Sequence, residues 1–232
     1  MFIGIDTSNY TTSLAAYDGE TMTSLKQLLK VPLGKIGLRQ SECVFSHMQT
    51  LGDMFEKMQN MGRLHNIEAI GVSDCPRRVP GSYMPVFMAG VQTARSLSSV
   101  LRVPLYTFSH QEGHIMAALF SSEDDFWKTG ESFLFLHLSG GTTEFLKCCF
   151  IKGGGFFSEI LGGTSDISAG QLIDRVGVKM GLPFPSGRYI EELSKNATDP
   201  YELPVNVSEN YLSFSGCEAE VFRIIERENI DM

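Results

Sequence analysis

The sequence lacks any long hydrophobic run: in its 232 residues, none approaches the roughly 18 apolar residues that a membrane-spanning helix needs. Its first residues, MFIGIDTSNY, lack the basic and apolar regions of a secretion signal. The five cysteines show no C-x-x-C spacing and are odd in number, which argues against a zinc ribbon and a disulfide framework. We therefore expect a soluble, cytoplasmic protein that has reduced thiols and no membrane partner.

The sequence is also poor in positive charge. Lysine and arginine number 19 against 27 aspartates and glutamates, which gives a net charge of -8. This balance argues against binding nucleic acid by bulk attraction, so any contact with RNA needs a local basic patch or a basic partner. Neither a Walker A pattern nor G-x-G-x-x-G is present, and neither a P-loop nor a Rossmann dinucleotide site is indicated.

Strand and helix patterns alternate along the chain. Hairpins are expected at Phe2–Asp6 with Thr12–Tyr17, and around SGGTT at Phe133–Leu138 with Glu144–Ile151. The two hairpins have similar sequences, because each has a buried strand, a small polar tip, Thr-Thr and a second strand. Helices are expected at about residues 40–61, 86–101, 109–120 and 167–180, and further strands at 67–73, 103–108 and 156–161. These elements predict α/β layers with a mixed sheet.

The helix at about 40–61 is predicted to be amphipathic. Apolar side chains recur in it at spacings of three and four, which is typical of a face that packs on a core. Its methionines are interpreted as core filling, and an exposed part of this stripe is a candidate docking face for a partner. The stripe consists of Val44, Met48, Leu51, Phe55 and Met58.

The segment SHQEGHIMAALF carries two histidines at the start of an apolar run. Ser109 and Glu112 have the spacing of a capping box. His110 and His114 then share one helix face, where the positive end of the helix dipole keeps both rings neutral and able to bind a metal. The alternative is a pair of partly exposed helix-start histidines, since a metal site needs three or more ligands. Gln111 follows His110, so the pattern is not H-E-x-x-H and does not favour a peptidase.

The segment HLSGGTTEF places two glycines and flanking hydroxyls after a buried strand. Gly140 and Gly141 predict exposed amides that a phosphate can approach, or else a hairpin turn that needs positive φ. At the first hairpin tip, Asp6 ends a strand beside Thr7 and Ser8. That tip predicts a site for a magnesium-phosphate group or a polar substrate, or a carboxylate that only caps the turn.

The segment GGTSDISAGQLIDRVGVKMGLPFPSG predicts a helix with two carboxylates along one edge. Asp166, Gly170 and Asp174 stand at i, i+4 and i+8, and the glycine between the carboxylates forms a shallow floor on which a ribose would rest. The alternative is that Asp166 caps this helix and Asp174 pairs with an arginine. FPSGRYIEEL then restarts a helix and puts Gly187 in a tight loop.

Taken together, these segments resemble one known family. In chain order they are GIDTSNYTTSLA, the PGS of VPGSYMP, SHQEGHIMAA, HLSGGTTE, GGTSDISAGQLIDRVGVKMGLPFPSG and LSFSG. They resemble the TsaD family, which makes threonylcarbamoyladenosine in tRNA and is also called glycoprotease or O-sialoglycoprotein endopeptidase. The segments GLRQSE and SHQEGH resemble the sequences of a divergent paralogous branch of that family.

The resemblance implies an α/β fold of the actin, heat-shock ATPase and sugar-kinase (ASKHA) type with two related domains. We place them at residues 1–108 and 109–232, the second carrying the histidine helix and being incomplete. His110 and His114 are implied to bind a divalent metal, iron or zinc, whereas no catalytic residue is assigned. Substrate or nucleotide positions are implied at His137, Leu138, Ser139, Gly140, Gly141, Asp174 and Gly187, with Asp6, Ser8, Thr142 and Glu191 as further candidates.

The implied reaction moves a threonylcarbamoyl group from its adenylate to the amino group of the adenosine beside the tRNA anticodon. In that reaction the metal acts as a Lewis acid, and the glycine loop and helix termini hold the phosphate. The implied partners are tRNA, a smaller paralogous TsaB-like subunit and a TsaE-like P-loop ATPase. Such an assembly supplies the positive surface that this acidic chain lacks.

Three departures from the family pattern are visible. Thr142 stands where the family's SGGHT loop has histidine, and the first tip reads Asp6-Thr7-Ser8-Asn9-Tyr10 instead of E-T-S-C-D. The chain also ends before the family's nucleoside-binding segment and the aspartate that is its third metal ligand. Two other functions therefore stay open: an ATPase or small-molecule kinase of the same fold, and a non-catalytic or nucleotide-binding paralog that acts as an assembly partner.

Overall fold

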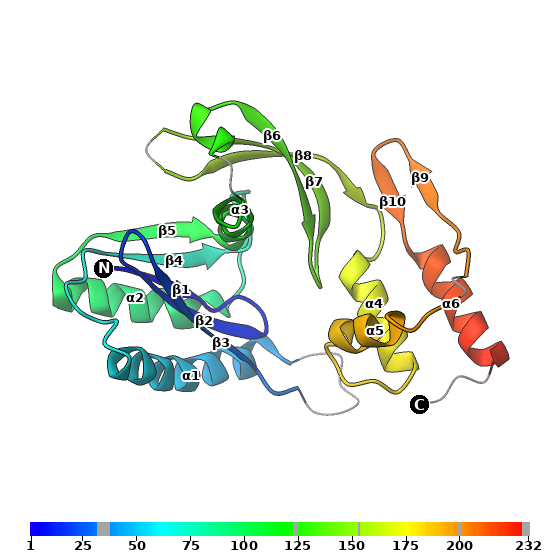
Figure 1. Cartoon of the computed structure of the whole chain (residues 1–232), viewed down its shortest axis with the longest axis horizontal. Coiled ribbons are helices and arrows are strands. Elements are labelled where there is room, and N and C mark those ends of the chain that lie inside the picture. Colours follow the sequence, from blue (N-terminus) through cyan, green and yellow to red (C-terminus); the bar gives the residue numbers. More distant parts are fainter. Residues whose placement is uncertain (32–37, 123–124, 153, 199–200, 229–232) are drawn as a thin grey trace. The chain divides into compact units, whose positions relative to one another are not determined.

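Strand β1 (Phe2–Asp6) lies at the centre of the first sheet. It pairs antiparallel with β2 (Thr11–Tyr17) on one side and parallel with β4 (Ala69–Cys75) on the other. Strands β3 (Met22–Leu28) and β5 (Leu105–Ser109) complete the order β3-β2-β1-β4-β5. This is a computed structural model that describes residues 1–31, 38–122, 125–152, 154–198 and 201–228, and Figure 1 shows its elements.

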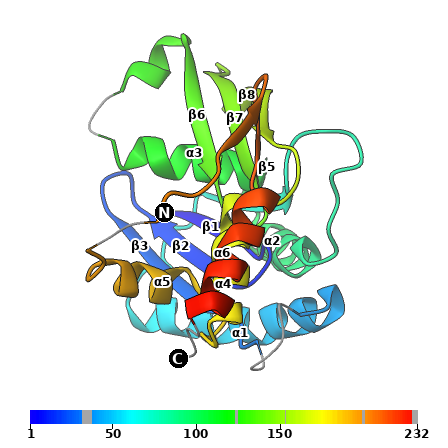
Figure 2. The same ribbon diagram turned by 90° about the vertical axis from the view of Figure 1, so that its right-hand side faces the viewer.

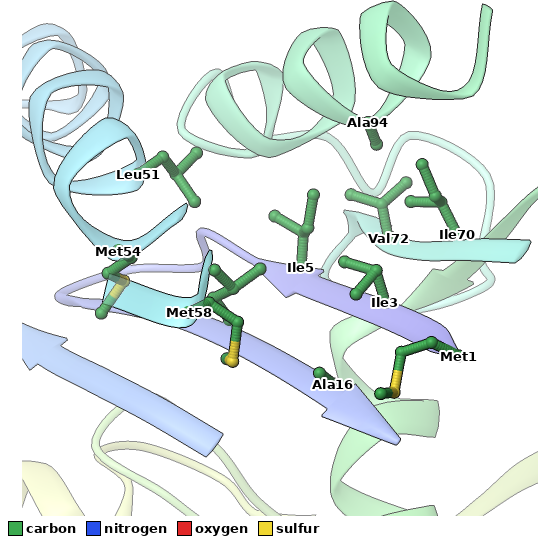
Figure 3. Close-up of a cluster of buried hydrophobic side chains, with 11 residues drawn as sticks. Met1, Ile3, Ile5, Ala16, Leu51, Met54, Met58, Ile70, Val72 and Ala94 are labelled. Atoms are coloured by element: carbon green, nitrogen blue, oxygen red, sulfur yellow. The ribbon is translucent and has the colours of Figure 1, made fainter. Parts of the chain in front are cut away.

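Helices α1 (Gln40–Asn60) and α2 (Phe87–Leu101) pack on one face of this sheet. Alternate residues of the strands point toward the helices, as the two-residue period of a strand requires. Figure 3 shows side chains of β1 and β4 directed toward Ala94 of α2, and those of α1 closing the other side. The buried cluster consists of Met1, Ile3, Ile5, Leu14, Ala16, Leu51, Met54, Met58, Ile70, Val72 and Ala94.

The predicted buried face of α1 is correct at Leu51, Phe55 and Met58 and wrong at Met48. Leu51 and Met58 are buried and Phe55 packs partly buried against the core, but Met48 is 62% exposed. The buried face is rotated toward Cys43, His47, Thr50 and Met54. The prediction followed apolar residues only. It therefore missed His47, a polar residue that occupies a buried position of this helix.

His47 is fully buried and connects α1 to the tip of the first hairpin. Its Nδ1 lies 2.7 Å from the hydroxyl of Thr12, and its Nε2 lies 3.1 Å from the carbonyl oxygen of Asn9. Asn9 has a φ of 50°, a left-handed conformation that asparagine tolerates better than most residues. Burial lowers the pKa of His47, although the contact with Asn9 opposes this shift. A neutral imidazole therefore holds the tip in place.

The second sheet begins with an antiparallel meander of β6 (Ser132–Leu138), β7 (Thr143–Phe150) and β8 (Phe156–Thr164). Strand β10 (Tyr211–Ser213) runs parallel to β8, and β9 (Asn206–Ser208) pairs antiparallel with β10. Three helices follow in this part of the chain: α4 (Ala169–Lys179), α5 (Gly187–Ser194) and α6 (Ser215–Glu228). Helix α4 contacts both α5 and α6 (Figure 2).

The chain divides into two compact units. The first contains Met1–Lys30 and Leu38–Glu123, and the second contains Asp124–Met232. The helix with the two histidines, α3 (His110–Phe120), belongs to the first unit, whereas the sequence-based division at residue 108 put it in the second. Of the described helices, none combines the length and the apolar composition that a membrane span needs.

The predicted α/β class is confirmed. The first unit has a three-stranded meander continued by two parallel strands with helices packed on one face. Strands β3, β9 and β10 and helix α6 were not predicted. The two short strands each contain only three residues, too few to show a periodic pattern.

We predict that replacing His47 by leucine destabilises the first unit by about 1–3 kcal/mol at pH 7.5, because the buried Thr12 hydroxyl loses its partner. Since the pKa of His47 is lower in the folded chain than in the unfolded one, its contribution is complete above about pH 6.5 and is lost as the pH falls below that value. The difference between wild type and variant should therefore shrink from pH 7.5 to pH 5. Urea unfolding followed by the amide NMR signals of β1 and β2 measures this, and a pH-independent difference would contradict it.

Candidate metal and substrate sites

The carboxyl ends of three strands meet at one edge of the first sheet. Strands β1, β4 and β5 are parallel, with Ile5 opposite Val72 and Val72 opposite Thr107. The chain leaves this edge at Asp6 in β1 and at Ser109 in β5, immediately before α3 begins. Residues that are far apart in the sequence are therefore brought to one place.

Helix α3 begins with the predicted capping box. The hydroxyl of Ser109 accepts a hydrogen bond from the Glu112 amide at 3.2 Å, and the Glu112 carboxylate accepts one from the Ser109 amide at 2.7 Å. The same carboxylate also pairs with Arg78 at 3.2 Å. This arrangement confirms Glu112 as a structural residue and fixes the direction of the first turn, on which both histidines stand.

The two histidines of α3 point toward each other. Their Nε2 atoms are 2.8 Å apart and their ring centroids 4.3 Å apart. Burial lowers the pKa of His114, and the charge of His110 lowers it further, so His114 is a neutral ring at pH 7. Two ligands of one zinc or iron ion, with bonds of about 2.1 Å, are separated by roughly 3.0–3.4 Å, close to this distance.

The histidine pair fits a metal ion as a partial site. Within the described ranges, no group of three or more His, Cys, Asp or Glu side chains is placed to hold a metal. Two imidazole nitrogens that converge on one point are nevertheless a recognised part of zinc and iron sites. The residues present would therefore supply two nitrogen ligands to such an ion.

Asp6 contacts Nδ1 of His110, whereas Nε2 of the same ring contacts His114. Its Oδ2 is 2.9 Å from Nδ1 of His110 and accepts a hydrogen bond from the Ser73 hydroxyl at 2.6 Å. Burial favours the protonated form of Asp6, but hydrogen bonds from His110, Ser73 and Ser8 and the charge of His110 outweigh it and hold the pKa well below its usual range. Asp6 is therefore an ionised carboxylate that contacts a histidine.

Ser8 completes this cluster but does not form a serine-hydrolase triad. Its amide and its hydroxyl both donate to Oδ1 of Asp6, and its Oγ is 2.9 Å from Nδ1 of His110 and 3.4 Å from Nε2. A triad needs the acid and the serine on opposite ring nitrogens, with the serine donating to the ring, whereas here the shorter Ser8 contact falls on Nδ1, the nitrogen that Asp6 contacts, and the serine proton goes to Asp6. Asp6 and Ser8 were expected to bind phosphate or substrate, but their hydrogen bonds hold the histidine. Ser73 was not predicted, because its place beside Asp6 depends on strand pairing.

The glycine loop of the second unit is an open turn. The Ser139 amide donates to the Thr142 carbonyl at 2.8 Å, and the Thr142 amide donates to the Ser139 hydroxyl at 3.1 Å. Neither Gly140 nor Gly141 has a positive φ, and a Cβ added at either position would meet no atom within 4 Å. The alternative of a hairpin turn that needs positive φ is therefore wrong. The space beside both glycines remains open to a ligand.

Gly170 has a packing role instead of the predicted one. A Cβ at this position would lie 2.3 Å from the carbonyl oxygen of Ser139 and 2.6 Å from Cα of Gly140. The Ser168 hydroxyl donates to the Gly140 carbonyl at 3.1 Å, and the Ala169 amide donates to the Thr143 hydroxyl at 2.8 Å. The prediction of a ribose floor at Gly170 is wrong, because the glycine loop itself covers this residue.

The two aspartates of the α4 segment hold the backbone of other elements. Asp174 accepts a hydrogen bond from the Ser186 amide at 2.7 Å, and the described part of the chain shows no ion pair between it and an arginine, which does not support the alternative of an arginine partner. Helix α4 is capped by Ser168, not by Asp166 as expected. Asp166 instead accepts hydrogen bonds at the start of α6, from the hydroxyl of Ser213 at 2.7 Å and the amides of Phe214 and Ser215 at 2.8 and 3.1 Å.

The remaining predicted positions also belong to the second unit. His137 is buried, whereas Leu138 is 56% exposed at the end of β6. Gly187 is the first residue of α5, and Glu191 lies one turn later; both are exposed. Gly187 thus follows Ser186, whose amide donates a hydrogen bond to Asp174. The glycine loop is hydrogen-bonded to the start of α4.

Comparison with known proteins gives one family. The family model described as "TsaD: tRNA N6-adenosine threonylcarbamoyltransferase" matches residues 41–231. Curated proteins named tRNA N6-adenosine threonylcarbamoyltransferase are similar to this chain. The one from Sulfurihydrogenibium sp. is 31% identical over 97% of this chain and 65% of its own length. The one from Methanopyrus kandleri is 29% identical, over 90% and 58%.

A third curated relative with that name, from Carboxydothermus hydrogenoformans, is 37% identical over 61% of this chain and 41% of its own length. The chain therefore spans between 41% and 65% of these three relatives. Among solved structures, "YeaZ from Pseudomonas aeruginosa" is 12% identical, with a TM-score of 0.42 over 98% of this chain and 92% of that one.

We predict opposite outcomes for two glycine-to-alanine changes in the second unit. Gly170→Ala should lower the free energy of unfolding by about 1–3 kcal/mol, because the new methyl group overlaps the Ser139 carbonyl. Gly141→Ala is the matched control and should change it by no more than about 0.5 kcal/mol. Trp127 is the single tryptophan, and its ring centroid lies 5.1 Å from that of Phe150. Its fluorescence during urea unfolding therefore reports on this unit. Equal effects of the two changes would contradict the packing role of Gly170.

Proposed function

This chain belongs to the TsaD family of tRNA N6-adenosine threonylcarbamoyltransferases, and on that premise we propose that it transfers a threonylcarbamoyl group from threonylcarbamoyl-adenylate to the adenosine beside a tRNA anticodon. The observation that carries the proposal is the convergence of the His110 and His114 Nε2 atoms, 2.8 Å apart. Family membership supports the reaction, and this convergence supports the site at which the intermediate is activated.

In this proposal His110 and His114 hold a divalent iron or zinc ion. When bound, the ion supplies a Lewis acid that polarises the carbonyl group of the intermediate. The two rings occupy only part of its coordination sphere, which leaves positions for oxygen atoms of the intermediate, for water, or for a carboxylate of another segment. The lowered pKa of His114 favours this role because it keeps the ring deprotonated at pH 7.

The glycine loop is proposed to hold the phosphate of the adenylate. Ser139, Gly140, Gly141 and Thr142 form a turn with open space at both glycines, and the start of α4 packs against it. Backbone amides at such a turn and at a helix N-terminus attract a phosphate. His137, buried at the end of β6, supports the strand that leads into the loop, and Leu138 borders it.

The start of α5 is proposed to contact the nucleoside. Gly187 and Glu191 are exposed on its first turns. There the Glu191 carboxylate and the backbone at Gly187, which carries no side chain, are suited to form hydrogen bonds with ribose hydroxyls. Asp174 acts here indirectly, since its carboxylate is used to hold the Ser186 amide. The proposed nucleoside contacts therefore depend on Asp174 for position.

Partners follow from the same proposal. The net charge of -8 makes tRNA binding by this chain alone unfavourable, so a TsaB-like subunit and a TsaE-like P-loop ATPase are proposed to act with it in the cytoplasm. Helix α1 offers a docking face for the TsaB-like subunit, because Phe45 and Met48 lie three residues apart and are 64% and 62% exposed. Neighbouring exposed apolar side chains are what the core of an interface patch is built from.

The metal assignment predicts that His110→Ala and His114→Ala each lose bound metal. The purified wild-type chain, loaded with zinc or iron and freed of excess metal, should retain close to one equivalent by elemental analysis, and each variant should retain less than a tenth of that. His65→Ala is the control, because His65 is an exposed histidine of the same unit and should not affect the metal content. Unchanged metal in both α3 variants would refute the assignment.

The reaction is tested by combining the chain with a TsaB-like subunit, threonylcarbamoyl-adenylate and tRNA. We expect labelled threonine to appear on tRNA, with the rate falling at least about 100-fold in His110→Ala, the loss typical of removing a major catalytic electrostatic group. Gly141→Ala should weaken adenylate binding without loss of stability.

Two other results would favour the other functions. Nucleotide hydrolysis that needs no tRNA and is unaffected by His110→Ala would favour a kinase or ATPase. Tight association with the subunit and no turnover would favour a nucleotide-binding or non-catalytic assembly partner.

A further inference from the structure

We propose that Asp6 is a positioning residue that fixes the proton of His110 on Nδ1 and so turns the lone pair of Nε2 toward His114. This inference deepens the proposed function and rests on the histidine pair being the metal site. Its basis is the set of hydrogen bonds that surrounds the Asp6 carboxylate.

The two oxygens of the Asp6 carboxylate are surrounded by hydrogen-bond donors. Oδ1 accepts from the amide and the hydroxyl of Ser8, and Oδ2 accepts from the hydroxyl of Ser73. The fourth contact is Nδ1 of His110, 2.9 Å from Oδ2. Because both oxygens accept from their other partners, the ring nitrogen is the donor in this contact as well.

Ser8 strengthens the same assignment. Its hydroxyl proton is directed to Oδ1 of Asp6, which leaves only oxygen lone pairs to face the His110 ring, at 2.9 Å from Nδ1 and 3.4 Å from Nε2. Nδ1, the nearer nitrogen, therefore has two acceptors beside it. A histidine binds a metal as the neutral ring, in which one nitrogen is a donor and the other an acceptor, so in that form a proton on Nδ1 leaves Nε2 with its lone pair.

The orientation of Nε2 is the functional consequence. It lies 2.8 Å from Nε2 of His114, the point at which the proposed metal binds. A carboxylate that holds the second nitrogen of a ligating histidine is a common feature of metal sites, and its loss typically lowers metal affinity by about 10–100-fold. Ser73, from the neighbouring parallel strand, holds Oδ2 in the position that this contact needs.

The tautomer of His110 in the metal-free chain provides a direct test. Long-range proton–nitrogen NMR spectra of wild type at neutral pH should show a protonated Nδ1 and an unprotonated Nε2. Asp6→Asn should shift His110 toward the opposite tautomer, as expected when an amide replaces an orienting carboxylate, while the amide spectrum of the first unit remains that of a folded chain. Asp6→Glu keeps a carboxylate and should restore the wild-type tautomer in part.

Zinc affinity, measured by competition with a chelating dye, is the second readout. Asp6→Asn should weaken zinc binding about 10–100-fold, Ser73→Ala should weaken it less, and Asp53→Asn, an exposed carboxylate on α1, should not affect it. A His110 that stays protonated on Nδ1 in Asp6→Asn, with wild-type zinc affinity, would overturn the inference. Failure of wild type to bind zinc would instead refute the proposed metal site, and the tautomer would still decide the role of Asp6.

Discussion

The parallel pairing of β1, β4 and β5 is the constraint on which the candidate metal site depends. Parallel strands end at the same edge of a sheet, and open α/β sheets commonly bind ligands beyond those carboxyl ends. In this chain the edge receives Asp6 from β1, Ser73 from β4 and, just after β5, His110. A shift in strand register would separate the carboxylate from the imidazole, because each residue step along a strand is about 3.3 Å.

Glycines in the second unit serve two distinct physical purposes. Gly170 permits α4 to approach the loop at Ser139 more closely than any other residue would allow. Gly140 and Gly141 have no such neighbour, and their backbone conformation does not require glycine. Their lack of side chains is therefore required neither by packing nor by backbone conformation, which agrees with the ligand loop proposed above.

The acidic residues show a similar division. Asp166 and Asp174 both accept hydrogen bonds from backbone amides of neighbouring elements, so their charge joins α4 to α6 and to the start of α5. In the proposed function, contacts with an anionic adenylate would then be made by backbone amides, which suits a chain with an excess of carboxylates. Asp6 differs from both, since it is the aspartate of the three that contacts another ionisable side chain.

The sequence by itself determined the local features: the capping box of Ser109 and Glu112, the common face of His110 and His114, the glycine loop, and the family to which these motifs belong. Spacings of three and four residues have a fixed geometry within a helix, so they can be interpreted without a fold. Only the tertiary structure decided that Asp6 contacts His110, 104 residues away, and that Asp166 holds the start of α6, 49 residues away. It also decided that Gly170 is a packing residue. These contacts depend on strand register and helix packing, which no short pattern in the sequence specifies.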